Sequence, residues 1–200
     1  MSIKRQRGLT MIELIVFIVI VGVAAAGMLG VISYTSSRSA DPWQRKQAML
    51  VAEALLEEVQ LAKFTYCHPN DSAAETATNS VACASATLRE NVGLQVAGET
   101  RPFFNINDYV STLGVATSMT AGDTSGRITD ATGAAMVSGN YTAKVTINAA
   151  AIGPAGLRVG TAGGTADNDA LRITVDVTYG ASQHIVLDTY RTRYAPNSLP

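Results

Sequence analysis

Hydrophobic and polar positions divide this chain of 200 residues into three stretches, and the first is purely apolar. It runs from 14 to 32 without a charged residue and follows Lys4, Arg5 and Arg7. About 20 mostly apolar residues suffice for a helix to cross a bilayer, and basic residues before such a helix remain in the cytoplasm. We therefore expect one membrane span near the N-terminus, with the later residues outside the cytoplasm.

The second stretch, from 43 to 62, has apolar residues at steps of three and four, which is typical of one buried face of a helix. Asp41-Pro42 precedes it and suits either a kink in one long helix or the start of a new one. A single helix from 9 to 62 would be about 80 Å long at 1.5 Å per residue. Charged residues such as Glu58 lie off the apolar face. That face consists of Ala48, Ala52, Leu55, Val59 and Ala62.

The third stretch carries strand signals at its end. Apolar and polar residues alternate in 141–147 and in 171–179, as in half-buried strands of an antiparallel sheet. A turn at 180–183 leads into a returning strand at 184–194. The sequence therefore predicts an α+β fold, in which a long N-terminal helix, hydrophobic and then amphipathic, packs on the antiparallel sheet of a head.

Four segments between these elements have a loop-like composition. The polar residues 63–86 predict a loop, and the small residues 117–139 predict an exposed loop. The aromatic segment 101–109 is expected to fill the gap between helix and sheet, with a ligand groove as the alternative. In the Gly-rich excursion 152–170, Asp167-Asn168-Asp169 offers oxygen ligands for calcium, but a solvated turn fits the spacing better.

The two cysteines, Cys67 and Cys83, both fall on the external side of the span. In an oxidising compartment such a pair favours a disulfide, and closing a loop of this size stabilises a chain by about 3 kcal/mol. Two free thiols, or a metal pair with His68, are the alternatives. A structural zinc site needs four ligands, and the only other histidine of the chain is His184. We therefore expect the disulfide.

Composition gives no indication of an enzyme or of nucleic-acid binding. The formal net charge is −1, whereas nucleic-acid binding calls for a basic stripe. The sequence contains no nucleotide motif, no Gly-x-Ser-x-Gly, no metal-ligand spacing and no recognisable catalytic pair of carboxylates. We expect a structural protein without a cofactor, a metal or a nucleic-acid partner.

The start of the apolar stretch has two unusual residues. Glu13 places a carboxylate where full membrane depth would cost about 2.5 to 3.5 kcal/mol, unless the side chain reaches headgroup water. Gly8 offers a protease an unhindered backbone, and cleavage there would leave the α-amine of Leu9 at the head of the helix. This amine and Glu13 can pair well between neighbouring helices, so that Glu13 would set the axial register of packed subunits.

A conventional secretory signal cut after Ala26 is the rival interpretation, since basic, apolar and small residues follow one another in the required order. Glu13, however, lies where the apolar core of such a signal would begin. The apolar run also continues beyond Ala26 to Ile32, which a removed signal does not need. We therefore favour a helix that the mature protein keeps.

Residues 7–14, Arg-Gly-Leu-Thr-Met-Ile-Glu-Leu, resemble the prepilin cleavage and methylation motif of type IV pilins and of type II secretion pseudopilins. The resemblance implies that Gly8 ends the leader and that Leu9 becomes the N-methylated first residue. It also implies that Glu13 is the conserved acidic residue of the motif. Phenylalanine is usual at the first mature position, so Leu9 departs from the pattern.

This resemblance implies a cytoplasmic leader at 1–8, then a helix at 9–62 that spans the inner membrane to about 32. A β-rich head at 63–200 would lie in the periplasm and later on the pilus or cell surface. The implied partners are a prepilin peptidase, the inner-membrane assembly platform and other pilins, which would bind through the N-terminal helix.

Parts of 39–58, together with 105–109 and 190–196, resemble the MshD-type minor pilins of the mannose-sensitive haemagglutinin (MSHA) pilus. The implied function is that of a minor pilin, which helps pilus assembly or forms part of the filament or its tip. A minor pseudopilin of a type II secretion system is one alternative. A tip adhesin, whose loops at 63–86 and 117–139 bind a surface, is the other.

Overall fold

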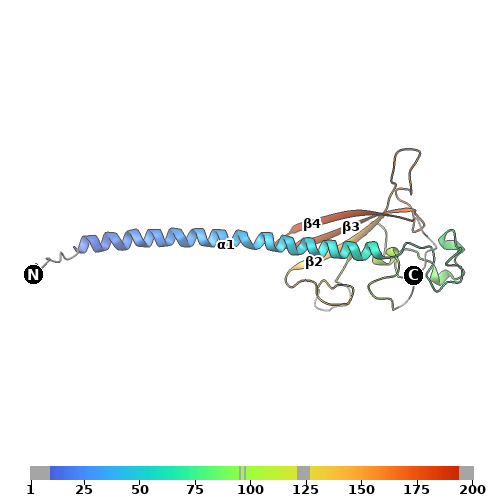
Figure 1. Cartoon of the computed structure of the whole chain (residues 1–200), viewed down its shortest axis with the longest axis horizontal. Helices are drawn as coiled ribbons and strands as arrows, with labels where there is room; N and C mark the ends of the chain where they lie inside the picture. The colour runs from blue at the N-terminus through green and yellow to red at the C-terminus, as the bar shows by residue number, and fades with distance from the viewer. Residues whose placement is uncertain (1–9, 95, 97, 121–126, 194–200) are drawn as a thin grey trace, which may run out of the picture. The chain divides into compact units, whose positions relative to one another are not determined.

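The computed structural model describes residues 10–94, 96, 98–120 and 127–193, and the side chains of these residues except those of 36–41. The chain divides into two compact units between Trp43 and Gln44. One long helix, α1 (Met11–Leu61), begins in the first unit and ends in the second (Figure 1). Three short 3-10 helices follow in the second unit: η1 (Ser80–Ala82), η2 (Ala86–Leu88) and η3 (Ile106–Tyr109).

The second unit contains one antiparallel sheet with the strand order β1-β2-β3-β4. Val145 lies opposite Val175, which in turn lies opposite Leu187. Because side chains alternate between the two faces, this register gathers the apolar side chains on one face of the sheet. The alternating segments thus form the predicted strands. The strands are β1 (Thr117–Ser118), β2 (Tyr141–Ala149), β3 (Ala170–Tyr179) and β4 (Gln183–Thr192).

The core of the second unit lies between α1 and the apolar face of the sheet. The apolar face predicted for the helix, from Ala48 to Ala62, is buried at every predicted position. Its side chains join those of β2 and β3 in one cluster. The predicted α+β fold, a long helix packed on an antiparallel sheet, is confirmed. The strand residues of the cluster include Ala143, Val145, Ile147, Ile173, Val175 and Val177.

Pro42 lies inside α1, so the alternative of a new helix that starts at Asp41-Pro42 is wrong. A proline in a helix interior removes one backbone hydrogen bond and costs about 3 kcal/mol. This cost is local, because the segments on either side of Pro42 in the 51-residue helix keep their own hydrogen bonds.

The aromatic segment 101–109 contributes to the core, as expected. Ile106 and Tyr109 of η3 are buried in the main cluster. The ring of Phe103 meets that of Tyr109 edge-on, with the centroids 4.9 Å apart. Phe103 is only half-buried, however, and its free side belongs to a groove.

The expectation of an exposed loop at 117–139 is wrong in part. Thr117 and Ser118 form β1 and pair with Val145 and Lys144 of β2. Met119 and Ile128 are buried in the core. The segment has too few apolar residues to show a period, and β1 forms because the edge of β2 offers its backbone a pairing partner. Residues 121–126 lie outside the described part of the chain.

Candidate functional site

The apolar part of α1, Met11–Thr35, is 25 residues long. At 1.5 Å per residue it extends over about 38 Å, and the hydrocarbon core of a bilayer is about 30 Å thick. In the described part of the chain it is the one helix long and apolar enough to cross a membrane, and none of it is buried inside the protein. Phe17 and Leu29, for example, are largely exposed. These properties fit membrane anchoring.

Glu13 is the single charged residue of this apolar segment and lies in the first turn of α1. The carbonyl of Thr10 accepts hydrogen bonds from the backbone N–H groups of Glu13 and Leu14, at 3.1 and 3.2 Å. A carboxylate in the first turn is favoured by the positive end of the helix dipole. Its side chain is exposed like those of its apolar neighbours, so it faces whatever surrounds the helix.

Gly8 and Leu9, the predicted cleavage and methylation residues, lie outside the described residues. Cleavage after Gly8 and methylation of Leu9 therefore stay predictions, as does the role of Glu13 in subunit register.

Residues 3–29 match a family model, the prokaryotic N-terminal methylation motif. The match supports a type IV pilin-like protein. It includes Gly8, Leu9 and Glu13 together with most of the apolar segment, and it indicates a structural protein that a prepilin peptidase processes. In comparisons with curated proteins and with solved structures, nothing matches the chain.

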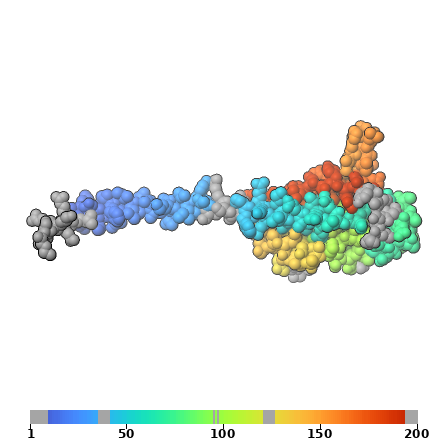
Figure 2. All heavy atoms as spheres, in the orientation of Figure 1, coloured from blue at the N-terminus to red at the C-terminus, as the bar shows by residue number. Residues whose placement is uncertain are grey.

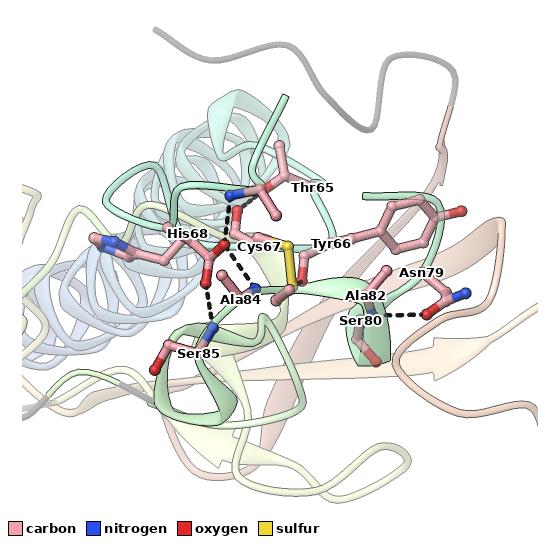
Figure 3. Close-up of a disulfide and its surroundings, with 12 residues drawn as sticks. Thr65, Tyr66, Cys67, His68, Asn79, Ser80, Ala82, Ala84 and Ser85 are labelled. Carbon is pink, nitrogen blue, oxygen red and sulfur yellow. Dashed lines mark hydrogen bonds between the residues drawn. A yellow bond between two sulfur atoms is a disulfide. The ribbon is translucent and has the colours of Figure 1, made fainter. Parts of the chain in front are cut away.

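In the head, Cys67 and Cys83 form a disulfide, with their Cα atoms 5.7 Å apart (Figure 3). Both cysteines are buried with Ala74 and Ala77 in a small apolar cluster. Because so small a cluster buries little apolar surface, the covalent bond is a principal stabiliser of the 67–83 loop. The alternatives of free thiols and of a metal pair are wrong, since both sulfur atoms are used in this bond.

Asp71 organises the same loop by accepting three backbone hydrogen bonds. Its carboxylate receives the N–H groups of Ala73 at 2.8 Å, Ala84 at 3.0 Å and Ser85 at 2.8 Å. Burial acts to raise the pKa of this carboxyl, but the three N–H groups outweigh it and hold the pKa below its usual value. The charged side chain therefore ties the beginning of the loop to its end.

His68 has structural partners on both ring nitrogens. Its Nδ1 accepts the backbone N–H of Asn70 at 3.2 Å, and its Nε2 lies 3.4 Å from Oε1 of Glu99. The ring also packs on Phe104, with centroids 5.5 Å apart. Among the described residues, no group of three or more His, Cys, Asp or Glu side chains is arranged to hold a metal ion.

The preferred interpretation of Asp167-Asn168-Asp169 as a solvated turn is wrong in part, because Asp169 is exposed but Asp167 and Asn168 make structural hydrogen bonds. Asp167 accepts hydrogen bonds from the backbone N–H of Ser80 at 3.1 Å and from its hydroxyl at 2.9 Å. Asn168 is buried; it accepts the N–H of Thr161 and donates to the carbonyl of Ala150. The carboxylate of Asp167 thus holds the excursion against the disulfide loop, and the amide of Asn168 ties the excursion to its own backbone.

Sequence reasoning missed two buried carboxyl groups, Glu90 and Asp108, which are 2% and 6% exposed. Burial, reinforced by Asp108 and Glu99, raises the pKa of Glu90 to about 8. Burial, reinforced by Glu99, raises the pKa of Asp108 to about 7. Nothing in the local sequence distinguishes these residues from solvated acids, because their burial depends on η3 and its neighbours.

Proposed function

We propose that this protein is a structural minor pilin, which a prepilin peptidase cuts after Gly8 and methylates at Leu9. The observation that carries the proposal is the methylation motif at 3–29, placed directly on an exposed, apolar helix with one carboxylate in its first turn. A permanent anchor has no use for that carboxylate. A subunit that leaves the bilayer for a filament gains from it, because the new α-amine of a neighbouring subunit can pair with it.

The cellular location of the protein and its binding partners follow from the same apolar part of α1. The chain waits in the inner membrane with its head in the periplasm until the leader is removed. The assembly platform then transfers it to a filament, in which the exposed apolar side chains of α1 pack against those of other pilins. Burial of apolar side chains between helices favours the filament, whereas an unpaired Glu13 opposes it.

We further propose the MSHA type of type IV pilus, on the resemblance of the segments around 39–58, 105–109 and 190–196 to MshD-type minor pilins. These three segments have different structural roles. The first includes buried helix residues, the second is η3 with its capping residue Asn105, and the third contains Arg193. The guanidinium of Arg193 lies over the ring of Phe64, 3.8 Å from its centroid.

The mature N-terminus tests the proposal most directly. Mass spectrometry of the protein from its native membrane should find a chain that begins with N-methylated leucine at position 9. The variant Gly8→Val should keep the leader, because a β-branched residue hinders the extended backbone that the peptidase needs. A mature chain that begins at Gly27 would restore the conventional signal and exclude the pilin function.

A further inference from the structure

The head carries a hairpin with an apolar tip between β2 and β3. Its base is formed by Ile152 and Val159, whose N–H groups each donate to the carbonyl of the other at 2.9 Å. A turn closes the tip, in which the N–H of Leu157 donates to the carbonyl of Pro154 at 3.1 Å. Figures 1 and 2 show this 152–159 hairpin projecting from the rest of the head.

The sequence fixes the shape of this hairpin before any partner is present. Gly153 has φ +108°, and a Cβ there would come within 2.9 Å of the carbonyl oxygen of Leu157. Gly160, just after the base, has φ +78°, and a Cβ there would clash with the carbonyl oxygen of Ala150. Only glycine fits both positions. A pre-ordered tip loses little conformational entropy when it binds.

The tip residues are apolar from Pro154 to Leu157 and are followed by the cation of Arg158. Leu157 is 79% exposed, more than any other large apolar side chain described in the head beyond α1. Arg158 is exposed too, and the described residues provide it with no ion pair. The hairpin therefore presents an apolar knob with a positive charge beside it.

The same head also contains a groove of about 560 Å³ along the end of α1. The groove is mostly apolar, and its charged lining residues are Glu57, Glu58, Lys63 and Asp130. Glu58 is neutralised by Arg101, so two acids and one base remain and the rim is negative. The apolar walls include Ala54, Leu61, Pro102, Phe103, Phe104 and Met136.

We infer that the 152–159 hairpin of one copy docks into this groove on the head of a second copy. The apolar tip matches the apolar walls, and Arg158 matches the acidic rim at Glu57 and Asp130. Figure 2 shows the orange hairpin and the gold segment around residue 135 on opposite sides of the teal part of α1, so a head does not fill its own groove. Two different surfaces meet in this contact, which therefore repeats from copy to copy and forms a row.

The contact is small compared with stable interfaces, which bury about 1,200–2,000 Å². It is therefore expected where copies are concentrated, as in one membrane or one filament, and not in dilute solution. The contact requires neither cleavage after Gly8 nor a filament, so it stands or fails apart from the proposed function.

Photo-cross-linking of the full chain in the membrane of expressing cells tests this inference. A benzophenone amino acid at position 157 should give a dimer on illumination, with the linked peptides drawn from 54–63, 102–104 or 130–136. The same probe at Tyr190, an exposed residue of β4, should give no dimer. No dimer from position 157, a link to another region, or links to lipid or other proteins alone would overturn the inference.

Charge-reversal variants at Arg158 and Glu57 distinguish specific docking from non-specific hydrophobic association. Arg158→Glu and Glu57→Arg should each lower the cross-linking yield about fivefold, because each places like charges together. The double variant should recover most of the yield, since the pair is restored with its signs reversed. Glu75→Arg, at an exposed position of the disulfide loop that does not line the groove, is the matched control and should leave the yield unchanged. Equal yields for all variants, or a double variant weaker than both singles, would contradict the contact.

Discussion

Arg101 holds Glu58 in a two-point ion pair between the segment 101–109 and α1. Its Nε donates to Oε1 of Glu58 at 2.9 Å, and its Nη2 donates to Oε2 at 2.6 Å. The side chains are only 7% and 10% exposed. The hydroxyl of Tyr109 donates to the same carboxylate at 3.0 Å. The pair therefore fixes the segment that brings Tyr109 into the core.

Breaking this pair should destabilise the head strongly. Arg101→Met leaves the carboxylate of Glu58 buried without its cation, which typically costs about 3–5 kcal/mol. For a unit of this size we expect the midpoint of thermal unfolding in detergent to fall by about 10 °C. Glu53→Gln, at an exposed position of the same helix, should change it little. The double variant Arg101→Met with Glu58→Leu should be more stable than Arg101→Met alone, since no unpaired charge remains; equal loss would argue against the pair.

The disulfide should stabilise the head by limiting the freedom of its unfolded loop. Its cysteines are 16 positions apart, and closure of a loop of that size contributes about 3 kcal/mol. Reduction, or replacement of Cys67 and Cys83 by alanine, should lower the unfolding midpoint by about 6 to 12 °C. Limited proteolysis should then cut within 67–88 first. A reductant should have no effect on the alanine variant, and a proteolysis pattern unchanged by reduction would refute the stabilising role.

The head should lose stability as the pH rises from about 4 to about 8. Glu90 and Asp108 have folded-state pKa values of about 8 and about 7, above their ordinary values of 4.5 and 3.8. The folded head therefore binds more protons than the unfolded chain in this range, and its free energy of unfolding falls with rising pH. The unfolding midpoint should be several degrees higher at pH 5 than at pH 8.5.

Glu90→Gln provides the check on this pH dependence, because the amide resembles the protonated carboxyl. The variant should flatten the pH profile, whereas Glu53→Gln should leave it unchanged. A profile that rises between pH 5 and pH 8.5 in the unmodified protein would show that the two carboxyls are ionised in the folded head.

Glu13 should matter for assembly and not for insertion. Glu13→Val removes a carboxylate whose burial in hydrocarbon costs energy, so membrane insertion should be intact. Without a partner for the α-amine of the next subunit, the amount of protein in sheared filaments should fall at least tenfold. Thr10→Val, a nearby change that leaves the charge in place, serves as the control. Unchanged incorporation of Glu13→Val would remove the role in subunit register.

The sequence by itself determined the parts of this protein that depend on local periodicity. A charge-free run predicts a membrane-type helix, and steps of three and four predict the buried face from Ala48 to Ala62. Strict alternation predicts β2 and β3, and the turn at 180–183 predicts β4 as the returning strand. Each pattern follows from the geometry of one element, 3.6 residues per helical turn or two per strand repeat. The motif around Gly8 and Glu13 is likewise local.

The tertiary structure alone decided what depends on contacts between distant residues. Glu58 appeared as one of several charges off the apolar face, yet it pairs with Arg101, 43 positions away. Asp167 appeared as part of a solvated turn, yet it accepts hydrogen bonds from Ser80, 87 positions away. Three further features also depend on contacts between distant residues: the burial of Glu90 and Asp108, the groove beside Leu61, and the projecting tip at Leu157. No local pattern contains them, because burial and pairing of a polar side chain depend on which segments the folded chain brings beside it.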